Sequence, residues 1–187
     1  MRNKIHFYKR CLYLCVVMLA TVSCNDWLDV EPKSQVKDKD LFSSETGFKE
    51  ALSGVYSIMT QEYLYGKELT FGMLGVLAQE WDYQPMVYLD DKDYTYESIQ
   101  TEIRIDSLWC GLYNAIANTN KLLGEIDAKK SLFTNPNYEV IKGEALALRG
   151  FLHFDLLRLF GASYAEDPAK KAIPYVTEYT PEVFPQK

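Results

Sequence analysis

Histidine and cysteine are scarce in this sequence of 187 residues, which has 2 His and 4 Cys. Beyond residue 24 only His153 and Cys110 remain. A single imidazole without a reactive partner is poor material for acid–base or nucleophilic catalysis, and it cannot form a multi-histidine zinc site. Cys110 lies in an apolar helical pattern and is expected in the core. We therefore predict that the protein is not an enzyme and needs no cofactor.

Basic residues are outnumbered, with 20 Lys and Arg against 26 Asp and Glu. Residues 1–23 carry four of the basic residues and no acidic one, so without them the formal charge falls from −6 to −10. An acidic chain without a basic stripe is a poor candidate for binding nucleic acid or anionic lipid. Neutral ligands and protein partners remain open.

The apolar run at residues 11–22 is shorter than the about 20 residues that a membrane-spanning helix needs. It follows the basic segment MRNKIHFYKR, and this combination is typical of a secretory signal. It ends at Ser23 and Cys24, a small residue before a cysteine, which resembles a bacterial lipobox. We predict that residues 1–23 are a lipoprotein signal peptide and that Cys24 carries the lipid, with palmitate among its chains. An ordinary signal peptide followed by a chance cysteine is the alternative.

Strand patterns are almost absent, and apolar residues recur at steps of three and four. Residues 24–44 are polar and are predicted to be an extended, lipidated tether. We expect a cap at Ser43 or Ser44, a helix start at Asn135–Pro136 and a helix end at Gly161. Helices are predicted at 45–63, 68–81, 98–127 and 136–160, with a loop at 82–97 and a proline-rich, not fully helical segment at 162–187.

Antiparallel helices with short connections usually stack in pairs as a solenoid. No 34-residue period is present, so tetratricopeptide-like pairing is an inference from the helix order. The sequence predicts an all-α fold of tetratricopeptide-like antiparallel helix pairs, an α-solenoid, over residues 45–187.

Aromatic residues gather in and beside the predicted loop at 82–97. Sugar rings present apolar C–H faces that stack on aromatic planes, and binding residues concentrate in loops. The alternative is that these rings only pack the loop onto its neighbouring helices. The candidate ligand-binding residues are Trp81, Tyr83, Tyr88, Tyr94 and Tyr96.

Acidic residues at 90, 91 and 93 suggest calcium, but the spacing fails. Counting from Asp91, the sixth position of an EF-hand loop holds Tyr96 instead of glycine. We therefore predict no metal site. No motif supports a pair of glycosidase carboxylates either.

Three stretches together resemble the SusD/RagB-like family of outer-membrane nutrient-uptake lipoproteins. The first is Cys24 to Pro32, with the order Cys, apolar–Leu–Asp and Pro. The second is a helix pattern at 109–120, and the third is the segment GEALALRGFLHFDLLRLFG at 143–161, followed by AIPYVT at 172–177. The residues of the helical motif are Trp109, Tyr113, Asn120, Glu144, Arg149, Asp155, Arg158 and Gly161.

This resemblance implies an outer-membrane, lipid-anchored and surface-exposed protein of Bacteroidetes-type bacteria. Family members bind glycans, or sometimes peptides, and pair with a SusC-like TonB-dependent transporter in polysaccharide utilisation. They are considerably longer, so we expect 45–187 to be a truncated SusD-like N-terminal domain. A tetratricopeptide-like protein-docking scaffold, or a non-functional gene fragment without a small ligand, is the alternative. Glu144 and Arg149 are expected to satisfy each other or nearby backbone, and Asp155 and Arg158 to pair on the surface.

Overall fold

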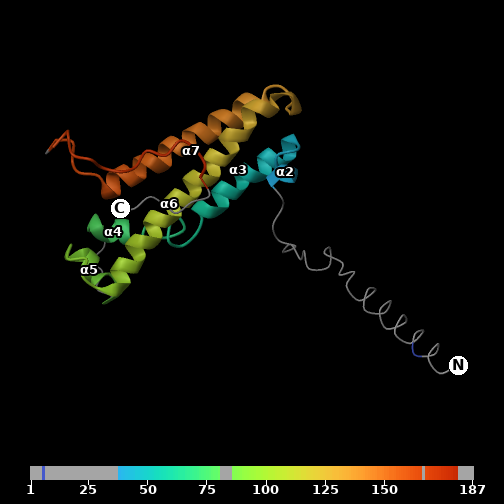
Figure 1. The fold of residues 1–187 in the computed structure, drawn as a ribbon. Helices are drawn as coiled ribbons and strands as arrows, with labels where there is room; N and C mark the ends of the chain where they lie inside the picture. The colour runs from blue at the N-terminus through green and yellow to red at the C-terminus, as the bar shows by residue number, and fades with distance from the viewer. Residues whose placement is uncertain (1–5, 7–37, 81–85, 166, 181–187) are drawn as a thin grey trace. The chain divides into compact units, whose positions relative to one another are not determined.

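The computed structural model describes residues 6, 38–80, 86–165 and 167–180 (Figure 1). The chain divides into two compact units, 1–36 and 37–187, and everything below concerns the second. Its regular structure is helical, without a strand among the residues described, which confirms the all-α prediction. The elements are α2 (Asp38–Leu41), α3 (Glu45–Met59), α4 (Met73–Leu77), η2 (Met86–Tyr88), α5 (Leu89–Lys92), α6 (Ile99–Ile126), η3 (Asp127–Leu132) and α7 (Asn137–Phe160).

The long helix α6 is the centre of the core, because α3 and α7 both pack against it (Figure 1). A helix covered on two sides must bury more than one apolar stripe. Accordingly α6 contributes side chains to the core along most of its length, whereas α3 and α7 each bury one stripe. The buried apolar residues of α6 are Leu108, Trp109, Leu112, Tyr113, Ala115, Ile116, Leu122 and Ile126. The antiparallel helices agree with the expected arrangement, and the tetratricopeptide-like detail stays a prediction.

The entry to α3 is fixed by a cap and a close backbone contact. The Ser44 hydroxyl accepts a hydrogen bond from the backbone N–H of Gly47 at 3.2 Å, as the sequence predicted for one of the two serines. A Cβ on Gly47 would lie 1.6 Å from the carbonyl oxygen of Leu41, so only glycine lets α2 approach α3 this closely. Residues 38–44 were expected in the extended tether. Instead they include α2, and the side chain of Phe42 lies in the core with 2% of its surface exposed.

The predicted helices at 45–63 and 68–81 were too long. The first is α3, which ends at Met59, and the second is only α4, Met73–Leu77. Between them the chain forms a series of turns. The Glu68 carboxylate accepts from the backbone N–H of Met73 at 2.9 Å, so a side chain takes the place that a helical carbonyl would have. Gly72 and Gly75 also weaken a helix at this place.

The predicted loop at 82–97 is partly helical, since residues 86–92 form η2 and α5. Acidic side chains close to a helix N-terminus stabilise it, and α5 carries Asp90 and Asp91 in its first turn. The Asp91 side chain is fully buried, so the local sequence alone gave no reason to expect its place in the fold.

The boundaries of the two long helices are close to those predicted. Helix α6 begins after Ser98, whose hydroxyl accepts from the N–H of Thr101, and α7 begins at Asn137 without a side-chain cap. Gly161 ends α7 as expected, but in an extended conformation instead of the left-handed one. A Cβ there would meet the carbonyl oxygen of Leu157 at 2.5 Å, so the glycine serves a close approach.

One face of α7 is apolar and exposed. It carries small residues at Gly143, Ala147 and Gly150, with nothing within 4 Å of where a Cβ of either glycine would lie. Larger apolar side chains flank them, among them Phe154 at 56% exposure. An apolar helix face of this kind normally packs against another element. Among the described residues, no helix is both long and apolar enough to cross a membrane.

Candidate functional site

Four side chains of α6 and α7 hold an extended segment, residues 172–179, which runs back over these helices (Figure 1). The Tyr113 hydroxyl donates to the carbonyl of Pro174 at 2.8 Å. The Asn120 amide donates to the carbonyl of Val176 at 3.0 Å, and Nη1 of Arg149 donates to the carbonyl of Thr177 at 3.2 Å. No strand among the described residues pairs with this segment, so these side chains satisfy its backbone groups.

His153 is the fourth of these side chains. Its Nε2 accepts the backbone N–H of Val176 at 3.0 Å, so the neutral ring carries its proton on Nδ1, which donates to the Arg149 carbonyl at 2.8 Å. Its ring also lies 4.4 Å, centroid to centroid, from that of Tyr175. Burial lowers the pKa of His153; the hydrogen bond to the Arg149 carbonyl opposes this, and the Arg149 charge adds to the lowering.

The predicted motif residues therefore act mainly on backbone and core. Trp109 is buried against Tyr113 and Phe160, with ring centroids 4.9 Å away in both cases. No hydrogen bond or ion pair joins Glu144 to Arg149 among the described residues, and of the two the expected bond to nearby backbone is made by Arg149. Glu144 accepts from the Tyr56 hydroxyl of α3 at 2.5 Å, whereas Arg149 bonds Asn120 and Thr177.

Asp155 and Arg158 form the expected ion pair, in which Arg158 is exposed as expected but Asp155 is buried. Asp155 is only 3% exposed, because Tyr65 from the turns after α3 covers it and donates its hydroxyl to the carboxylate at 2.6 Å. This contact and burial raise the pKa of Tyr65. The hydrogen bond between Tyr65 and Asp155 thus ties α7 to the turns that precede α4.

The segment after α5 carries two of the five candidate aromatic residues on the surface. Tyr94 is 50% and Tyr96 39% exposed, and both have a φ of 56°. The Tyr94 hydroxyl donates to the Leu77 carbonyl at 2.5 Å, so its ring is fixed above α4. Tyr96 borders a pocket of about 220 Å³ whose other walls include Ile105 and Phe160. Positive φ in a bulky residue costs about 1–3 kcal/mol and is found preferentially at functional sites.

The other three candidates differ from these two. Tyr88 is only 6% exposed, so its ring offers no face to solvent. Its hydroxyl donates to the Glu68 carboxylate at 2.8 Å, and the Arg104 guanidinium lies 4.3 Å from its ring centroid. Trp81 and Tyr83, as well as the predicted lipid site Cys24, lie outside the described residues.

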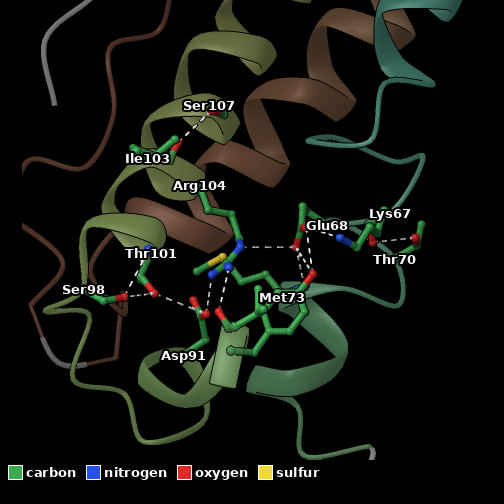
Figure 2. Close-up of polar contacts among 12 residues, drawn as sticks. Lys67, Glu68, Thr70, Met73, Asp91, Ser98, Thr101, Ile103, Arg104 and Ser107 are labelled. Atoms are coloured by element: carbon green, nitrogen blue, oxygen red, sulfur yellow. Dashed lines mark hydrogen bonds and ion pairs between the residues drawn. The ribbon is translucent and has the colours of Figure 1, made fainter. Parts of the chain in front are cut away.

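Tyr88 belongs to a buried ionic cluster that supports the Tyr94–Tyr96 segment, with Arg104 at its centre. Figure 2 shows Arg104 reaching from α6 between Glu68 and Asp91. The guanidinium pairs with Asp91, lies 3.7 Å from the Glu68 carboxylate and donates to the Val87 carbonyl at 2.9 Å. The Arg104 side chain thereby joins α6 to the turn at Glu68 and to the continuous segment of η2 and α5.

Asp91 is the most constrained member of this cluster. Thr101 donates to its Oδ2, the oxygen that also pairs with Arg104, whereas its Oδ1 has no hydrogen-bond partner within the described part of the chain. Burial raises the pKa of Asp91, and Arg104 opposes this rise. The sequence held no signal for Glu68 or Arg104, because the contacts of Arg104 with Glu68 and Asp91 join residues from separate parts of the chain. Within the ranges described, no group of three or more His, Cys, Asp and Glu side chains could hold a metal ion.

A model of a SusD-like family, described as starch-binding associating with outer membrane, matches residues 26–186, and this chain belongs to that family. SusD-like proteins bind ligands and are not enzymes, so membership confirms the predicted absence of catalysis.

The chain is also similar to SusD-like protein P25 of Formosa agariphila. The two are 20% identical over 153 residues, which cover 78% of this chain and 29% of that protein. The chain thus spans less than a third of the length of the curated relative that it matches. No solved structure matches the chain.

Replacement of Arg104 by Met should destabilise the domain by about 3–5 kcal/mol, because it leaves the buried Asp91 and Glu68 carboxylates without their cation. Urea unfolding would measure this loss. Lys49→Met is the matched control, because Lys49 pairs with Glu45 on the surface and should cost less than about 1 kcal/mol. Equal losses in both variants would contradict a central role for Arg104.

The hold of His153 on the extended segment should weaken in acid. Its folded-state pKa lies below the usual 6.5, so the unfolded chain binds the proton more readily and stability is lost as pH falls below about 6.5. Urea unfolding at about pH 7.5 and about pH 5.5 measures this loss. His153→Gln, which can accept the Val176 N–H without titrating, should show a smaller difference between the two pH values. An unchanged difference would rule out His153 as its source.

Proposed function

We propose that this chain is a cell-surface glycan-binding lipoprotein subunit of a SusC/SusD-type TonB-dependent uptake system. The observation that carries the proposal is the family match over residues 26–186, because the family is described as starch-binding and associated with the outer membrane. The similarity to a SusD-like protein over 78% of the chain adds to it.

The glycan-binding surface that we propose is centred on Tyr94 and Tyr96, with Trp81 and Tyr83 as further candidates. Exposed rings can stack on the apolar faces of sugars, and the positive φ of both tyrosines supports a functional reason for their conformation. We assign Tyr88 a structural role instead of a ligand contact. Its hydroxyl bonds Glu68 and its ring packs against Arg104.

This binding surface is tested by Tyr96→Ala, assayed by isothermal titration calorimetry against a panel of soluble neutral glycans. We expect the affinity for the best glycan to fall about tenfold, or about 1.4 kcal/mol, because a stacking face is lost. Tyr164→Ala is the control, since Tyr164 is exposed on the segment after α7 and should leave the affinity unchanged. Equal affinities of the wild type and a folded Tyr96→Ala variant would exclude this surface.

We further propose that a lipid on Cys24 anchors the protein to the outer membrane, beside a SusC-like TonB-dependent transporter. Palmitate labelling and membrane fractionation of the full chain and its Cys24→Ser variant test the anchor. We expect label and outer-membrane location only in the wild type, together with a co-purified transporter. Label in the variant would disprove lipidation at Cys24, and an anchored chain that co-purifies with no transporter would disprove the partnership.

Protein docking is the second candidate function, and the exposed apolar face of α7 favours it. On this alternative the chain is a tetratricopeptide-like scaffold without a small ligand. The calorimetric experiment separates the two functions, because a folded chain that binds none of the glycans supports docking.

A further inference from the structure

A second pocket lies between α6, α7 and the extended segment 172–179. It has a volume of about 590 Å³, within the range of small-molecule sites. It shares no lining residue with the pocket beside Tyr96. Its walls include Asn120, Lys121, Glu125, Lys142, Arg149 and Tyr179.

Arg149 is the unusual residue of this pocket. It makes hydrogen bonds through Nη1 to two neutral oxygens, Oδ1 of Asn120 and the carbonyl of Thr177, both at 3.2 Å. No ion pair joins it to a carboxylate in the described part of the chain. Its Nε and Nη2 make no hydrogen bond to a described residue. That edge of a guanidinium matches a carboxylate in geometry and can bind it with two parallel hydrogen bonds.

Two lysines add positive charge to the same wall. Lys121 lies over the ring of Tyr179, with its Nζ 4.8 Å from the centroid, and Lys142 pairs with Asp127 at 2.6 Å. The lining carries three cations, Lys121, Lys142 and Arg149, against the two carboxylates of Glu125 and Glu178, so the pocket is slightly positive in a chain that is acidic as a whole. An anionic group is therefore favoured there and disfavoured over an average part of the surface.

We propose that this pocket binds a sugar that bears a carboxylate, such as a uronate unit of an acidic glycan. Arg149 receives the carboxylate, and the ring of Tyr179, which is partly exposed, offers an apolar face to the sugar. Glu125 and Glu178 also line the pocket and can accept hydrogen bonds from hydroxyl groups. A sugar ring presents hydroxyl groups to these two carboxylates and an apolar face to Tyr179, whereas an acidic peptide such as triglutamate has neither, which favours a sugar.

The proposal is tested by calorimetry on the full chain with three probes: trigalacturonate, the neutral trisaccharide obtained by reducing its carboxyl groups, and triglutamate. We expect trigalacturonate to bind at least about tenfold more tightly than the other two. Arg149→Met and Lys121→Gln should each weaken its binding about tenfold, whereas Lys170→Met, which removes an exposed cation outside the pocket, should not.

Arg149→Met also removes a contact with the extended segment, so its fold is checked by circular dichroism. If that variant does not fold, Lys121→Gln decides. Equal binding of the acid and its reduced form, tighter binding of triglutamate, or unchanged affinity in both folded variants would each overturn the proposal. The proposal rests on the glycan-binding function proposed above, but the two fail separately, because the Tyr96 surface is measured with neutral glycans and other variants.

Discussion

The burial of α6 between α3 and α7 is the constraint on which the rest of the structure depends. Because both neighbours cover it, α6 contributes apolar side chains to the core on more than one side. Its few polar residues in the interior must then find partners there, since an unpaired buried polar group costs about 1–3 kcal/mol. Arg104 near its start and Asn120 near its end meet this demand with residues from other parts of the chain.

Both of these polar contacts organise surfaces where we propose that ligands bind. Arg104 contacts Glu68, Asp91 and the Val87 carbonyl. It thereby holds η2 and α5, the elements that come directly before the exposed tyrosines. Asn120 and Arg149 hold the extended segment that forms one wall of the larger pocket. A rigid helical scaffold that positions binding residues on irregular segments is a common arrangement in binding proteins.

Much of the fold followed from periodicity. Helices α6 and α7 begin and end within one residue of their predicted limits, because long segments with regular apolar spacing and clear ends leave little choice. Helix α4 was overestimated because Glu68, a good helix former by propensity, uses its side chain as a backbone acceptor. For the candidate site, exposure separates Tyr94 and Tyr96 from the buried Tyr88, and composition gave no sign of that difference.

The sequence by itself determined the order of the long helices, the family motif and the scarcity of histidine and cysteine. These features depend on residue types and on spacing along the chain. Only the tertiary structure decided what the motif residues touch. Arg149 bonds Asn120 and Thr177 instead of Glu144, and Asp155 is buried under Tyr65. Such contacts join residues about 28 to 90 positions apart, and their geometry is set by how the helices pack.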